Sequence, residues 1–95
     1  MHEIPEISPD ELKQLQTSEF FLLDVREPHE FCARNLNGHL IPLAELPDRL
    51  NEIPKDKPIV VHCRSGMRSA QAVEFLLSNG FTDVVNLKGG ILACD

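Results

Sequence analysis

A cysteine followed by two arginines lies where a buried strand is expected to end and a helix to begin. The segment reads His62-Cys63-Arg64-Ser65-Gly66-Met67-Arg68-Ser69 and follows the β-branched run Ile59-Val60-Val61. The unpaired N–H groups and positive dipole of a helix N-terminus favour an anion, and Arg64 and Arg68 add two cations. All of these groups favour the thiolate, the nucleophilic form of cysteine.

The pattern therefore predicts Cys63 as a catalytic nucleophile. Gly66 permits the tight turn that the loop requires. A small buried cysteine at a strand end is the structural alternative, and the two arginines, the glycine and the strand–loop–helix context favour the reactive thiol. The expected substrate-binding residues are the rest of the loop: Arg64, Ser65, Gly66, Met67 and Arg68.

Two chemistries that handle anions use a loop of this design, and its length separates them. Protein tyrosine phosphatases resemble His-Cys-x-x-Gly-x-x-Arg-Ser, with one more residue between cysteine and arginine than the four found here. A smaller ring of N–H groups suits one additional sulfur atom better than a tetrahedral phosphate. Phosphatase or arsenate reductase activity is accordingly the less favoured interpretation.

The elements around this loop alternate between strand and helix. Ser8 and Glu11 form a capping-box pattern that predicts a helix to about Gln16. The expected strands are Ile4 to Ile7, Phe20 to Val25, His39 to Pro42, Ile59 to Val61 and Val84 to Leu87, and the expected helices are Pro28 to Ala33 and one that ends near Asn79. Leu43, Leu46 and Leu50 allow a further helix, in which Pro47 must lie in the first turn or break it. This alternation predicts an α/β fold with a mostly parallel sheet.

Length and charge limit the class of protein. The 95 residues predict a single domain, 1–95, and the net charge of −6 argues against nucleic-acid binding. No apolar run approaches the about 20 residues that cross a bilayer, and the N-terminal segment Met1 to Glu6 lacks the basic and apolar regions of a secretory signal. We therefore expect a cytoplasmic protein. An odd number of cysteines, three, without a Cys-x-x-Cys pair argues against a disulfide framework and a zinc site.

Nearly the whole chain resembles the rhodanese family. Besides the loop, the matching segments are Phe21 to Phe31, Asn35 to Leu43 and Asn86 to Ala93. The last two look most like the rhodanese domain fused to adenylyltransferases that activate sulfur carriers for molybdopterin and thiamine synthesis. The resemblance implies a five-stranded, mostly parallel sheet flanked by helices, with Cys63 as the sulfur acceptor.

The resemblance also implies an activity. Cys63 would carry sulfane sulfur as a persulfide, taken from thiosulfate or another donor and passed to cyanide, a thiol or an acceptor protein such as a sulfur carrier. No metal or organic cofactor is implied. A non-catalytic module that binds proteins or carries the persulfide as cargo is the alternative within the same family.

One departure from the family pattern and several supporting residues complete the expectation. The family usually has tryptophan where Cys94 stands, which predicts a lost aromatic packing contact and an accessible thiol near the terminus. Cys32 is expected to pack against the sheet, and the alternative is a second thiol that resolves the persulfide by disulfide exchange. Asp24 is expected to hold the loop by accepting from Arg68 or from backbone N–H groups, and a local pair between Asp24 and Arg26 is the alternative.

The two histidines near these elements have less specific expectations. Strand alternation directs His62 away from the side of Cys63, which favours a core or supporting role over that of a general base. His39 is expected to pack or hydrogen-bond near the end of the strand that carries Asp24.

Overall fold

A parallel sheet of five strands forms the centre of the computed structural model, which describes residues 4–94. The strand order is β1-β5-β4-β2-β3, and every neighbouring pair is parallel. The strands are β1 (Glu6–Ile7), β2 (Phe21–Asp24), β3 (His39–Leu40), β4 (Ile59–His62) and β5 (Val84–Leu87). Because β4 lies at the centre, the loop that follows it emerges in the middle of the carboxyl edge.

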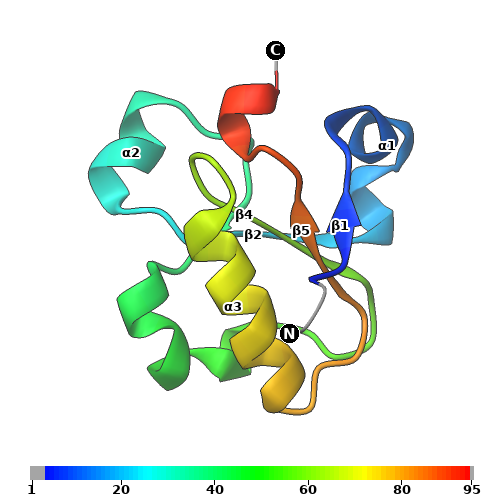
Figure 1. Ribbon diagram of the computed structural model, residues 1–95. Coiled ribbons are helices and arrows are strands. Elements are labelled where there is room, and N and C mark those ends of the chain that lie inside the picture. The colour runs from blue at the N-terminus through cyan, green and yellow to red at the C-terminus, as the bar shows by residue number, and fades with distance from the viewer. Residues whose placement is uncertain (1–3, 95) are drawn as a thin grey trace.

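Three α-helices are described: α1 (Pro9–Gln14), α2 (Pro28–Ala33) and α3 (Met67–Ser78). In Figure 1, α3 crosses in front of the sheet, and it packs on β4 and β5. The remaining helical segments are short 3₁₀ turns, at Thr17–Glu19, Leu43–Asp48, Leu50–Glu52 and Ile91–Ala93. Among the described helices, none is long and apolar enough to cross a membrane.

The sheet is covered on both faces, as its apolar strands require. Val61 belongs to the larger cluster of buried side chains, which includes Val73 and Leu76 of α3. Val60, the neighbouring residue on β4, belongs to a second cluster with Phe20 and other residues. This alternation buries all four residues of β4, and a strand fixed on both sides gives the following loop a rigid start.

The α/β architecture and the parallel five-stranded sheet are as predicted. The capping box of Ser8 and Glu11 is also present, with hydrogen bonds in both directions. Of the two outcomes expected at Pro47, the structure shows the break: residues 43–52 form two 3₁₀ segments, because Pro47 has no N–H to continue an α-helix. The expectations for Met1–Glu3 fall outside the described residues.

Candidate active site

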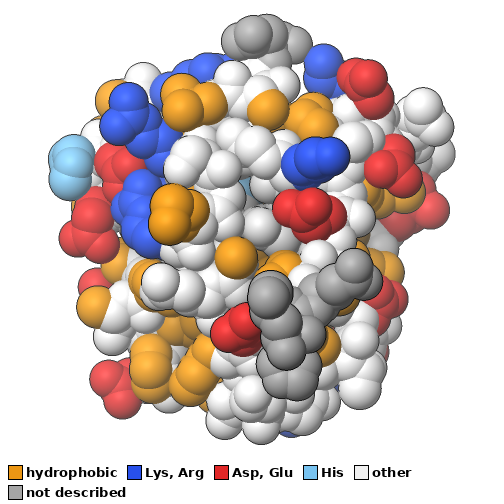
Figure 2. Space-filling view, in the orientation of Figure 1, with side chains coloured by type: hydrophobic (Ala, Val, Ile, Leu, Met, Phe, Trp, Pro, Cys, Tyr) orange, Lys and Arg blue, Asp and Glu red, His pale blue; other side chains and the backbone are white. Residues whose placement is uncertain are grey.

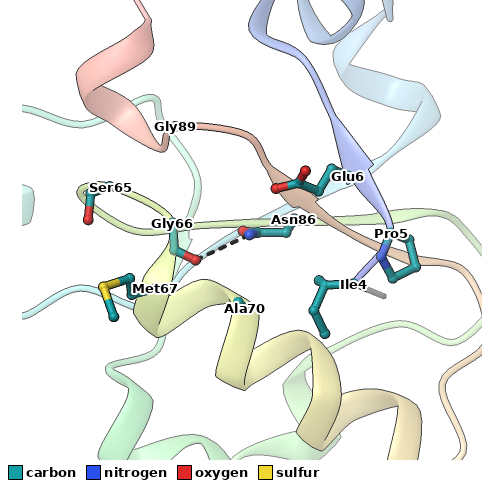
Figure 3. Close-up of a pocket in the computed structure, with 9 residues that line it drawn as sticks. All are labelled: Ile4, Pro5, Glu6, Ser65, Gly66, Met67, Ala70, Asn86 and Gly89. Atoms are coloured by element: carbon teal, nitrogen blue, oxygen red, sulfur yellow. Dashed lines mark hydrogen bonds between the residues drawn. The ribbon is translucent and has the colours of Figure 1, made fainter. Parts of the chain in front are cut away.

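Cys63 directly follows β4 and begins the loop that leads into α3. Its side chain is buried, with an exposed fraction of 1%. Gly66 is the N-cap of α3 with a φ of 112°, a left-handed conformation that glycine adopts without strain. Ser65, Gly66 and Met67 curve around this turn in Figure 3. A reactant must therefore enter the ring of the loop to reach the sulfur.

The sulfur of Cys63 accepts hydrogen bonds from the beginning of α3. The Gly66 N–H donates at 3.1 Å, and the backbone N–H and hydroxyl of Ser69 each lie 3.4 Å from Sγ. Burial raises the pKa of the Cys63 thiol, but the hydrogen bonds from Ser69 and the loop backbone outweigh it, and the pKa falls below its usual value. The loop therefore favours the thiolate.

Ser69 is in turn connected to β5 through Asn86. The Ser69 hydroxyl donates to Asn86 Oδ1. Asn86 Nδ2 donates to the Gly66 carbonyl at 3.2 Å, the bond drawn in Figure 3. Both side chains are buried, at 0% and 3% exposure. Asn86 thus links β5 to both the loop and the first turn of α3.

The C-terminal 3₁₀ turn supports the loop from behind. The N–H groups of Ile91 and Leu92 donate to the carbonyls of Cys63 and Arg64, at 2.9 and 3.1 Å. Gly90 has a φ of 64°, and a Cβ placed on it would lie 2.4 Å from the Arg64 carbonyl oxygen. The loop and the turn approach so closely that no other residue fits at position 90.

Arg68 forms its ion pair with Glu30 of α2. The two guanidinium nitrogens donate to the two carboxylate oxygens at 2.7 and 2.9 Å. The hydrogen bond from Arg68 lowers the pKa of Glu30 to about 2 and raises the pKa of Arg68. The expectation that Asp24 accepts from Arg68 is wrong, because Glu30 reaches the guanidinium from the neighbouring helix.

Asp24 forms the local pair with Arg26 that the sequence left open. The Arg26 guanidinium donates to both Asp24 carboxylate oxygens and to the carbonyls of Glu30 and Arg34. Both side chains are almost fully buried. The pair therefore satisfies carbonyls at the end of α2 and positions that helix, and Asp24 supports the loop indirectly through Glu30.

The remaining loop side chains face outward. Arg64 and Ser65 are exposed, and Met67 is 77% exposed. Arg64 lines a cleft with His29, Arg34 and Leu92. Figure 2 shows Lys and Arg side chains gathered over α2 and the loop. A chain with a net charge of −6 thus presents cations beside the thiol.

A second pocket lies between the loop and β1, with Gly66, Met67, Asn86 and Glu6 among its lining residues (Figure 3). Cys63 is not among the residues that line it. This pocket adjoins the outside of the loop and gives no direct route to the sulfur.

The other cysteines differ from expectation. Cys32 is exposed on α2 instead of packing against the sheet. Cys94 is buried, with 8% exposure, and packs with Phe20, Val60 and Leu87. The position at which the family usually has tryptophan therefore remains a packing position, occupied by a smaller side chain.

Both histidines lie apart from the expected chemistry. His62 is fully buried with Nε2 3.6 Å from Asp24 Oδ2, beyond hydrogen-bond length, and burial lowers its pKa. This location agrees with the core role expected of it. His39 pairs with Glu52 at 2.7 Å and contacts the ring of Phe21. Strand β3 places it opposite Leu23, the neighbour of Asp24, so it packs and hydrogen-bonds beside that strand as expected.

Sequence reasoning missed three residues around the sulfur. Ser69 directly follows the loop at the third position of α3, where a backbone N–H has no partner within the helix. Asn86 interrupts the apolar strand Val84–Leu87, and a buried amide requires polar partners. Glu30 had no comparable signal, because it reaches Arg68 from α2, a helix 38 residues earlier in the sequence.

The comparisons with known proteins agree with this geometry. The family model described as rhodanese-like domain matches residues 8–94. A protein named sulfurtransferase from Allochromatium vinosum is 40% identical over 93 residues, which are 95% of this chain and 87% of that protein. A crystal structure of a rhodanese-like domain protein from Staphylococcus aureus superposes with a TM-score of 0.87 at 37% identity, covering 97% of this chain and 92% of that chain.

A further relative has the architecture that the sequence resembled. The probable adenylyltransferase/sulfurtransferase MoeZ of Mycobacterium tuberculosis is 38% identical over 92 residues, which are 92% of this chain and 24% of that protein. The similarity thus covers a minor part of MoeZ. Taken with the loop, the sheet order and the matching family model, these similarities show that the chain belongs to the rhodanese-like domain family.

Proposed function

We propose that this protein is a sulfurtransferase that moves sulfane sulfur from thiosulfate to a nucleophilic acceptor through a persulfide on Cys63. The observation that supports this most directly is the sulfur's position. Cys63 Sγ is buried at the start of α3 and accepts from Gly66 and Ser69, which lowers its pKa. Cytosolic conditions keep such a thiol reduced, and we propose that compartment.

In the first step, the Cys63 thiolate attacks the outer sulfur of thiosulfate. A new S–S bond forms, the original S–S bond breaks, and sulfite leaves with the electron pair. The electron pair of Sγ enters the new bond, and the outer sulfur keeps the negative charge that it carried in thiosulfate. The charge inside the loop therefore lies on the outer sulfur of the persulfide. The N–H groups at the start of α3 and within the loop are the donors that would stabilise it.

In the second step, the acceptor attacks the outer sulfur, and the bond to Cys63 Sγ breaks. With cyanide the product is thiocyanate, and the thiolate of Cys63 returns. Ser69 and Gly66 stabilise this leaving group by the same hydrogen bonds that favoured the attack. The two steps balance without an oxidant, a metal or an organic cofactor.

The exposed residues of the loop suggest how reactants are received. Arg64 is a cation on the surface beside the loop, where it attracts anionic donors such as thiosulfate. Met67 presents an apolar side chain next to it. The relative with an adenylyltransferase region supports a protein acceptor, such as a sulfur carrier, in addition to small thiols.

The test is intact-mass measurement after treatment with thiosulfate. We expect a gain of about 32 Da, one sulfur atom, located on Cys63 and removed by cyanide, with thiocyanate released over many turnovers. Cys63→Ser should gain no mass and release no thiocyanate. A Cys63→Ser protein that turns over would refute the proposal, and mass gain without turnover would favour the persulfide-carrier module.

A further inference from the structure

The Ser69 hydroxyl lies between two acceptors. On one side is Cys63 Sγ at 3.4 Å, and on the other is Asn86 Oδ1, which makes the shorter contact. A hydroxyl carries one proton and donates one full hydrogen bond at a time. When the hydroxyl donates to one of these acceptors, the other loses that donor. Because Ser69 has no exposed surface, bulk water does not replace it.

The orientation of the Asn86 amide is fixed by the Gly66 carbonyl. This oxygen only accepts, and it receives the Asn86 Nδ2 at 3.2 Å and the Ala70 N–H at 3.0 Å. Turning the amide over would place two oxygens against each other at Gly66. Asn86 therefore presents Oδ1, an acceptor, to the Ser69 hydroxyl.

The protonation state of Cys63 decides where the hydroxyl proton goes. A neutral thiol can donate its own proton to Ser69 Oγ while Ser69 donates to Asn86, and all three groups are then satisfied. A thiolate has no proton to give and accepts strongly, so the Ser69 hydroxyl gains by turning to Sγ. Turning leaves the buried Asn86 oxygen without that donor, which has a cost.

We propose that Asn86 is a positioning residue that competes with Cys63 for the Ser69 hydroxyl proton, holding it while Sγ is uncharged and giving it up when Sγ carries charge. The competition makes the thiolate less favourable than Ser69 alone would make it. Asn86 thereby sets how strongly the loop activates Cys63.

This inference rests on the proposed function for its role in the reaction. In the persulfide the charge lies on the outer sulfur, so Sγ is a weak acceptor and the hydroxyl returns to Asn86. As the bond to the outer sulfur breaks, charge returns to Sγ and the hydroxyl turns toward it. The hydrogen bond thus forms when the leaving group needs it.

The experiment measures the midpoint of Cys63 alkylation against pH in the full chain. Iodoacetamide is the probe, the background is Cys32→Ser so that the exposed thiol does not react, and Cys63 is followed by peptide mass. Asn86→Leu removes the acceptor at similar size. We expect its midpoint to fall by about half a unit, which is about threefold in thiolate well below the midpoint.

Two further variants separate competition from simple support. Ser69→Ala should raise the midpoint, and adding Asn86→Leu to Ser69→Ala should change it no further, because no shared proton remains. If Asn86 merely holds the loop, Asn86→Leu will raise the midpoint with or without Ser69. That result, or an unchanged midpoint in Asn86→Leu, would overturn the proposal.

Asn86→Ala, which also removes the acceptor, replaces the leucine variant if circular dichroism shows that the latter does not fold. The alkylation readout needs no sulfur donor. An expected shift in a protein that takes no sulfur from thiosulfate would support the proton competition and refute the proposed function.

Discussion

Arg68, the last residue of the cysteine loop, is held by Glu30 of α2 through two hydrogen bonds of 2.7 and 2.9 Å. The pair joins elements that lie far apart in the sequence, and it offsets the positive charge of the guanidinium beside the thiol. Glu30 also accepts from the Glu27 N–H at 2.9 Å. One carboxylate therefore caps α2 and moderates the charge at the loop.

Removal of that carboxylate should make Cys63 more acidic. Glu30→Gln keeps an oxygen for the Glu27 N–H but leaves the Arg68 charge uncompensated, so we expect the alkylation midpoint to fall by a few tenths of a unit. Arg68→Ala should raise it. Glu52→Gln, which breaks a surface ion pair with Arg49 outside the site, is the matched control and should leave it unchanged. Equal midpoints in all of these variants would show that the pair does not affect the thiol.

The free energy of unfolding should fall in two stages as the pH is lowered. The pKa of His62 in the folded protein is below its ordinary 6.5, so the folded state disfavours the proton and stability is lost as pH falls below 6.5. The pKa of Glu30 falls from 4.5 to about 2 on folding, so its contribution is present above 4.5 and is lost between 4.5 and 2.

Urea unfolding midpoints from pH 8 to pH 2 test this dependence. Glu52 has a pKa of about 2 as well and contributes to the lower stage. Glu30→Gln and Glu52→Gln should each flatten the lower stage and leave the upper stage unchanged. A midpoint that rises on acidification would contradict both assignments.

Gly90→Ala should destabilise the protein by more than the cost of placing alanine at a positive φ. Its Cβ would meet the Arg64 carbonyl at 2.4 Å, in addition to the strain of a φ of 64°. We expect the free energy of unfolding to fall by about 3 kcal/mol. Cys63 should also lose its preferential alkylation over an ordinary thiol. Gly80→Ala, at a φ of 91° with its nearest contact at 3.4 Å, is the control and should cost about 1 kcal/mol.

Cys94→Ser should lower stability more than Cys32→Ser does, and neither should greatly change turnover. Cys94 is buried in an apolar cluster, so a hydroxyl there should cost about 1 kcal/mol of stability. Cys32 is exposed, and its replacement should change stability by less than about 0.5 kcal/mol. Both variants should keep turnover within about threefold of the parent. A hundredfold loss in either folded variant would give that thiol a part in the sulfur relay.

The sheet and the cysteine loop were predictable because the sequence patterns that indicate them are local. The run Ile59 to Val61, followed at once by cysteine, arginine and glycine, predicts both a buried strand and an anion-binding turn. Helix capping at Ser8 was equally local. The pattern was ambiguous around Pro47, where it allowed an α-helix and the structure has 3₁₀ turns.

The partners of charged and polar groups were not predictable in the same way. Asp24 lies two residues before Arg26 and was also an expected partner for Arg68, and the choice depends on where α2 places Glu30. Asn86 reaches Ser69 because β4 and β5 are neighbours in the sheet. Such contacts depend on the packed arrangement of several elements, which no single segment encodes.

The hydrogen bonds from Ile91 and Leu92 to the carbonyls of Cys63 and Arg64 also bear on how the protein is made. Translation delivers Cys63 well before these donors, and before the β5 residue Asn86 that secures Gly66. A nascent chain holding everything up to α3 therefore lacks the supports that shape the loop. The loop can take its final shape only when residues 84–92 have folded onto the sheet, so synthesis would delay the sulfur chemistry that we propose for Cys63.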